Sequence, residues 1–227
     1  MAKAIPVYFE RGAKRTFACA IEWPGWCRSG PDDTSTLQAL LDSGPRYARI
    51  VRTTRLGFRA PASLSSFRVV RTLRGNATTD FGAPGIPPRE DDAPLDDAEL
   101  KRLGALLAAV WRAFDAAVRD ARGKRLAKGP RGGGRDLEAI MRHVSEAEAG
   151  YLAGLGWKFK WDERADRRAE VERTRSAVLD GLAASAHGEI AAKGPRGGRR
   201  WRPRYFVRRL AWHAIDHTWE IEDRVVG

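Results

Sequence analysis

The chain has 227 residues, of which 43% are hydrophobic and 31% charged, and its formal net charge at pH 7 is +12. No segment has the uninterrupted apolar length that crosses a bilayer, and the N-terminus lacks the apolar core of a signal peptide. We therefore expect a cytoplasmic protein with no membrane segment. Two cysteines, Cys19 and Cys27, are too few for a disulfide framework. We expect these two positions to be a small buried residue and a free thiol.

The first 75 residues predict a small α+β module. Residues 5–23 contain two runs of β-branched and aromatic residues separated by a short turn, which indicates a β-hairpin. A helix is expected after Asp32 and Asp33, with leucines along one face, and Pro45 ends or kinks it. An alternating run near residues 65–75 indicates a further strand. The module 1–75 is therefore small but long enough to fold alone.

The remainder predicts a linker followed by an all-α four-helix bundle. Residues 76–95 carry four prolines and fit neither the helical nor the strand period, so they indicate a connector, rich in proline, glycine and acidic residues. Apolar residues then recur at steps of three and four in four stretches, which are 96–121, 135–154, 163–192 and 202–224. A bundle domain over 96–227 is the expected architecture.

Histidines in the second half are spaced for a metal site. His213 and His217 are four residues apart, which places both imidazoles on one face of a helix, and apolar residues share that face. Two such imidazoles can ligate one ion, and His143 lies in another predicted helix. A pair of hydrogen-bonded core histidines is the structural alternative, because neutral imidazole is also an ordinary buried polar group.

Two basic, glycine-rich segments precede the histidine-bearing helices. The sequence AKGPRGG occurs at 127–133 and again at 192–198. Glycine-rich backbone ahead of a helix can hold an anion, although a plain interhelix connection fits the same composition. Segment 193–209 contains eight basic residues and no acidic one. It indicates either a solvated basic face or a surface for nucleic acid or another anionic partner.

The bundle half resembles the DinB-like superfamily of metalloenzymes. The matching residues are RHVSEAEAGYL, which contains His143, Glu146 and Glu148, and the late helix LAWHAIDHTWEIEDR. The resemblance implies a four-helix bundle in which His143, His213 and His217 hold a divalent ion such as zinc or nickel. It also implies that the ion activates a low-molecular-weight thiol or water.

One position departs from the pattern of that family. Its late helix commonly continues into a further histidine, and the position four residues after His217 is Ile221, which cannot bind a metal. Two ligand sets therefore stay open. The first is His143, His213 and His217, which we prefer because it uses every nearby imidazole; the second is His143 and His217 with a carboxylate from Glu220.

Two acidic residues are candidates for the chemistry. Asp216 and Glu220 each follow a histidine by three residues, and either one could orient a ligand or act as a general base. Ion pairs along the helix are the alternative role for both. With a metal at the histidines, the sequence predicts a transferase or hydrolase acting with a small thiol or a small organic substrate.

The N-terminal module resembles HicB-like domains of antitoxins. The residues concerned are FACAIEWPGWCRSG and the following TSTLQALL. This resemblance implies an interaction module without catalytic residues. It supports an alternative hypothesis, a non-catalytic regulatory or binding protein that engages a partner or nucleic acid through the module and the basic segment 193–209. A monomer and a dimer are both compatible with the sequence.

Overall fold

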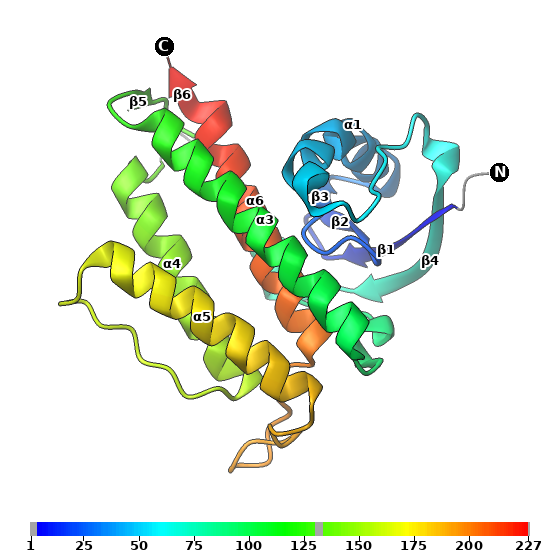
Figure 1. Ribbon diagram of the computed structural model, residues 1–227. Helices are drawn as coiled ribbons and strands as arrows, with labels where there is room; N and C mark the ends of the chain where they lie inside the picture. Colours follow the sequence, from blue (N-terminus) through cyan, green and yellow to red (C-terminus); the bar gives the residue numbers. More distant parts are fainter. Residues whose placement is uncertain (1–3, 130–133, 227) are drawn as a thin grey trace. The chain divides into compact units, whose positions relative to one another are not determined.

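The computed structural model describes residues 4–129 and 134–226. The chain has an α+β architecture and divides into two compact units, Met1–Ala93 and Pro94–Gly227 (Figure 1). The boundary between Ala93 and Pro94 lies inside the connector expected at residues 76–95.

The first unit is built on a four-stranded sheet with the strand order β3-β2-β1-β4. Strands β1 (Ile5–Arg11) and β2 (Thr16–Ala20) pair antiparallel from Val7↔Ala20 to Arg11↔Thr16, which confirms the predicted hairpin. The predicted strand near 65–75 is β4 (Phe67–Arg74), and it runs parallel to β1. Strand β3 (Cys27–Gly30), which pairs antiparallel with β2, was not predicted.

Helix α1 (Asp33–Val51) packs on β2 and β3 and supplies much of the first core. Asp32 caps its start by accepting the backbone N–H of Ser35 at 2.8 Å. The helix continues through Pro45 to Val51, so the proline does not end it. Trp26, which precedes the helix, is fully buried. It donates its indole N–H to the carbonyl of Leu40 at 3.1 Å and stacks on the ring of Tyr47, and both of these residues belong to α1. This aromatic cluster is therefore a packing feature.

The two cysteines form a disulfide, so the expectation of a free thiol is wrong. Cys19 and Cys27 face each other in the antiparallel register of β2 and β3, with their Cα atoms 4.1 Å apart. Adjacent strands bring such a pair together whatever the total number of cysteines. A disulfide is rare in a reducing compartment, and the cytoplasmic location therefore stays a prediction.

Residues 76–93 belong to the first unit instead of forming a separate linker. They contain the short helix α2 (Ala77–Phe81) and the 3-10 turn η3 (Arg89–Asp92), and two further turns, η1 (Arg52–Thr54) and η2 (Leu64–Ser66), precede β4. Buried Glu10 of β1 accepts three hydrogen bonds from this segment, from the Thr79 hydroxyl at 2.5 Å, Gly85 N–H at 2.9 Å and Ile86 N–H at 3.0 Å. These bonds fasten the segment to the sheet.

The second unit contains four long helices near the predicted positions. They are α3 (Asp97–Ala121), α4 (Leu137–Leu155), α5 (Arg167–Ala186) and α6 (Pro203–Arg224). Three of these helices are capped by an aspartate that accepts the backbone N–H of the residue three positions later. The capping residues are Asp96, Asp136 and Asp166. Helix α5 is shorter than the predicted stretch 163–192, because its start is fixed by Asp166 and Gly188 follows its end with φ +77°.

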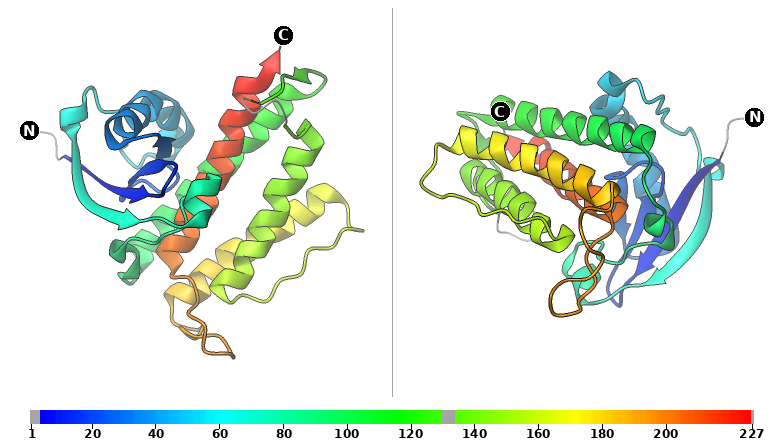
Figure 2. Two further views of the ribbon diagram at one scale, coloured as in Figure 1. Left: turned by 180° about the vertical axis from the view of Figure 1, so that it is seen from behind. Right: turned by 60° about the horizontal axis from the view of Figure 1, so that its bottom comes forward.

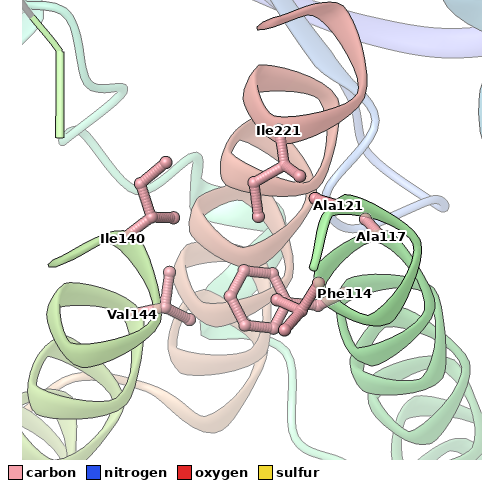
Figure 3. Close-up of a cluster of buried hydrophobic side chains, with 7 residues drawn as sticks. Phe114, Ala117, Ala121, Ile140, Val144 and Ile221 are labelled. Carbon is pink, nitrogen blue, oxygen red and sulfur yellow. The ribbon is translucent and has the colours of Figure 1, made fainter. Parts of the chain in front are cut away.

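Helices α3 and α4 both pack against α6, and α4 also packs against α5 (Figures 1 and 2). A two-stranded ribbon of β5 (Arg125–Leu126) and β6 (Val225–Val226) joins the ends of α3 and α6. Near that end a cluster of buried apolar side chains fills the space between α3, α4 and α6 (Figure 3); it consists of Phe114, Ala117, Val118, Ala121, Ile140, Val144 and Ile221. In the described part of the chain, no helix combines the length and apolarity needed to span a membrane.

Candidate metal centre

Three histidines meet where α4 and α6 pack together. His143 projects from α4 and is half-buried, whereas His213 and His217 lie one turn apart on α6 and are 7% and 9% exposed. The centroids of the three rings are 4.7–5.0 Å apart in every pair. The predicted i, i+4 face of α6 therefore points inward, and α4 adds the third imidazole.

The imidazole nitrogens are close enough to share one ion. One nitrogen from each ring can be chosen so that all three lie within 4.8 Å of one another. The Nε2 atoms of His143 and His213 are 3.1 Å apart. Two nitrogens bound to the same tetrahedral zinc, with bonds of about 2.0 Å, are about 3.3 Å apart. The spacing of this pair thus fits a shared metal, and it also fits a single N–H···N hydrogen bond.

Burial keeps His143 and His213 in the form that binds metals. Desolvation, helped by the positive charge of Arg135, lowers the pKa of His143 to about 4. Desolvation also holds the pKa of His213 well below its ordinary value, with the neighbouring histidines adding to the effect. Both rings are therefore neutral at pH 7, and a neutral imidazole offers a lone pair to a metal ion.

His217 is oriented by a hydrogen-bonded chain. Its Nδ1 lies 2.7 Å from Oε2 of Glu220, which leaves Nε2 free to act as a ligand atom. The other carboxylate oxygen of Glu220 pairs with Arg224, and these contacts lower the pKa of Glu220. A carboxylate that accepts the second N–H of a ligating histidine is a recurrent feature of protein zinc sites.

Arg224 ties the chain beside the site to α6. Its Nε donates to the carbonyl of Ala127 and its Nη2 to that of Arg135, both at 2.8 Å. Gly134 has φ +145°, and a Cβ there would lie 2.5 Å from the guanidinium. A glycine is needed at this position because the backbone closes directly onto Arg224.

His213 has a fully buried nitrogen, Nδ1, that makes no hydrogen bond with the described residues. The ring lies edge-on to that of Tyr151 at 5.8 Å. A buried imidazole without partners for both nitrogens is costly unless one of them serves another purpose.

Ile221 explains why α6 carries no further ligand. It is fully buried and belongs to the apolar cluster of Figure 3, with Ile140 and Val144 of α4. It lies one turn after His217, and Val144 directly follows His143 in the chain. An apolar side chain therefore stands four residues after His217, where a further ligand on the same face of α6 would lie.

The two acidic candidates are placed differently from the histidines. Neither Asp216 nor Glu220 joins the group of potential ligand atoms among the described residues. Glu220 is engaged with His217 and Arg224, which favours the ligand set His143, His213 and His217 over the set that uses its carboxylate. Asp216 is half-buried on α6.

Sequence reasoning gave no special role to Glu148. This carboxyl is 3% exposed and accepts the indole N–H of Trp111 at 2.8 Å. Burial raises its pKa to about 7. By contrast Glu146 is exposed and pairs with Arg142 on the surface of α4. The helical period of α4 could have separated the two glutamates, because Glu148 falls on the face that carries Val144 and Leu152.

Of the first glycine-rich segment, a candidate anion site, residues 130–133 lie outside the described part of the chain. The second segment forms a tight hairpin in which Lys193 and Arg199 pair as an antiparallel bridge.

Comparison with known proteins found no matching family model, no similar curated protein and no similar solved structure.

Proposed function

We propose that this protein is a metalloprotein whose helical unit is a DinB-like four-helix bundle and holds one divalent ion, zinc or nickel, through His143, His213 and His217. The observation that carries the proposal is the convergence of three imidazoles from two helices, with ligand atoms within 4.8 Å of one another. Three protein ligands are the number that leaves a tetrahedral ion one open position.

The surrounding residues have definite roles in this proposal. His143, His213 and His217 hold the ion, Glu220 fixes the ring of His217, and Arg224 fixes Glu220. The apolar cluster around Ile221 excludes water from one end of the site. A divalent ion in such a setting lowers the pKa of a bound water or thiol and so supplies a nucleophile at neutral pH. The corresponding reaction class is transfer or hydrolysis with a small thiol or small organic substrate.

The competing explanation is a hydrogen-bonded core, in which His143 and His213 share one proton. That explanation accounts for the 3.1 Å contact between His143 and His213. It gives no reason for three imidazoles to converge instead of two. The metal explanation engages all three rings, and we favour it for that reason.

Metal titration tests the proposal directly. We expect purified protein to bind one equivalent of zinc or nickel, and His213→Ala and His217→Ala to lose at least tenfold in affinity. His187→Ala is the matched control, because His187 caps the end of α5 and contacts Asp97 away from the trio. Absence of stoichiometric binding, or equal affinity in His213→Ala and the wild type, would overturn the proposal. Circular dichroism of the metal-free variants checks that they fold.

A further inference from the structure

A second candidate site lies at the C-terminal end of α4, in a groove of about 770 Å³. It is lined by two segments that are far apart in the sequence. The first is the end of α4 with the stretch that follows it, residues 153–154 and 156–160, and the second is the glycine-rich hairpin with Trp201, residues 194–195 and 198–201. We call this surface the basic groove.

The basic groove has a uniform charge. Its lining contains Lys158, Lys160, Arg199 and Arg200 and no acidic residue. The side chains of Lys158, Lys160 and Arg199 are exposed, and they form no ion pair with the described residues. Arg200 donates to the carbonyl of Ala191 at 3.0 Å, so its charge is likewise not neutralised by an acid. Unpaired cations of this kind attract phosphate groups.

Aromatic rings alternate with these cations. Trp157, Phe159 and Trp201 line the groove and are each only partly buried. Phe159 is held by Arg173, whose guanidinium lies 4.1 Å from the ring centroid and which also donates to the carbonyl of Lys160 at 2.6 Å. The stretch after α4 is therefore fixed in place although it has no regular structure.

Three glycines allow the groove side chains to pack closely. A Cβ at Gly154 would lie 2.9 Å from the Trp201 ring, and one at Gly156 would lie 2.4 Å from the guanidinium of Arg200. A Cβ at Gly181 of α5 would lie 3.1 Å from Trp157. The backbone also joins the two segments, because Trp201 N–H donates to the carbonyl of Gly154 at 2.9 Å. The groove is thus built by specific packing and is more than a run of surface charge.

We propose that the basic groove binds single-stranded nucleic acid, with phosphates against Lys158, Lys160 and Arg199 and bases against the partly exposed tryptophans. Cations that follow a backbone, interleaved with aromatic faces on which bases stack, are the features that single-strand binding surfaces share. An open groove suits a continuous strand, whereas a free nucleotide is usually enclosed in a deeper pocket. The bases of a duplex are stacked on each other and cannot reach the aromatic rings.

Fluorescence anisotropy with a labelled 20-residue oligothymidylate tests the proposal on the full chain. We expect binding at low salt that weakens steeply as salt is added. We expect at least tenfold weaker binding by the triple variant Lys158→Ala, Lys160→Ala, Arg199→Ala. Its plot of log affinity against log salt should also be less steep by about 2, since each single-strand phosphate contact contributes about 0.7 to the slope.

A matched control removes the same charge elsewhere in the second unit. The control replaces three exposed residues outside the groove with alanine, namely Lys101, Arg122 and Lys124. This variant is expected to bind the oligonucleotide as the wild type does. Equal weakening in both triple variants would overturn the proposal, because it would show that net charge alone causes binding. So would a lack of binding at low salt, or equal affinity for duplex DNA or for inorganic polyphosphate, which offers no base to stack. Thermal melting of both variants verifies their folding.

Discussion

Glu220 contacts two side chains at once, and its position illustrates how single residues set up the candidate metal centre. One carboxylate oxygen meets Nδ1 of His217 and the other pairs with Arg224. The contact with Glu220 holds the His217 ring in one orientation, with Nε2 available as a ligand atom. These contacts favour a positioning role for Glu220 over that of the general base, which its spacing also allowed.

The substitution Glu220→Gln separates orientation from charge. Glutamine keeps an oxygen near Nδ1 of His217 but removes the charge, so we expect the affinity for zinc to fall about tenfold with the fold retained. Isothermal titration measures the change. Glu146→Gln is the control, since Glu146 pairs with Arg142 on the exposed side of α4. If both variants bind zinc as the wild type does, Glu220 has no role at the site.

We expect the buried carboxyl of Glu148 to make the free energy of unfolding depend on pH. Its folded-state pKa of about 7 lies above the ordinary value of 4.5, so the folded state holds a proton that the unfolded state releases. The resulting stability is fully present below pH 4.5 and is lost as the pH rises through about 7, a change of about 3 kcal/mol in the free energy of unfolding. His143 acts in the opposite direction, because its contribution is lost as the pH falls from 6.5 through about 4.

Comparison with Glu148→Gln isolates the first of these two effects. Glutamine accepts the indole N–H of Trp111 but does not titrate, so the variant should gain stability relative to the wild type between pH 4.5 and pH 8. Urea unfolding at several pH values gives the difference directly, and the histidine contribution cancels in it. A difference that stays constant with pH would show that Glu148 is ionised in the folded state throughout.

At the scale of elements, α4 carries two glycines with opposite surroundings. Gly150 has no atom within 4 Å of an added Cβ, whereas at Gly154 the Cβ would press on the Trp201 ring at 2.9 Å. That ring lies between Tyr151 and Tyr205 and its backbone is bonded to Gly154, so it cannot move aside at low cost. The same helix thus contains a glycine that only weakens it and one that its packing requires.

Alanine at each position should therefore have opposite effects. Gly150→Ala removes a poor helix former and is expected to stabilise the second unit by about 0.5–1 kcal/mol. Gly154→Ala makes the same gain but overpacks Trp201, which costs about 1–3 kcal/mol, so a net loss is expected. Thermal melting of both variants checks the signs. Stabilisation by both substitutions would mean that Trp201 is not held against α4.

What the sequence could predict depends on the range of each interaction. The four long helices and the i, i+4 pair of His213 and His217 follow from local periodicity, and the structure places both rings on an inward face. His143 is 70 residues away, and a family resemblance, not spacing, connected it to that pair. Strand β3 has only four residues and no alternation, and the Cys19–Cys27 pairing depends on strand register, so neither was visible in the sequence.

At the scale of the whole molecule, the chemistry is divided between two units. The disulfide lies in the unit Met1–Ala93, whereas the three histidines and the basic groove lie in the unit Pro94–Gly227. Each unit has its own buried apolar residues. A ligand that binds only one folded unit stabilises that unit alone by mass action, provided that the two unfold separately.

Calorimetry with two additives tests this division. Zinc at 100 times its dissociation constant stabilises the unit that binds it by about 2.7 kcal/mol, which raises its melting temperature by about 10 °C. Reduction of the Cys19–Cys27 disulfide, which closes a short loop, should remove about 2–3 kcal/mol from the other unit. We therefore expect two transitions, one raised by zinc and the other lowered by reductant, and no zinc effect in His213→Ala. A single transition that responds to both additives would show that the units unfold together, because the stabilities of the two cores would then be coupled.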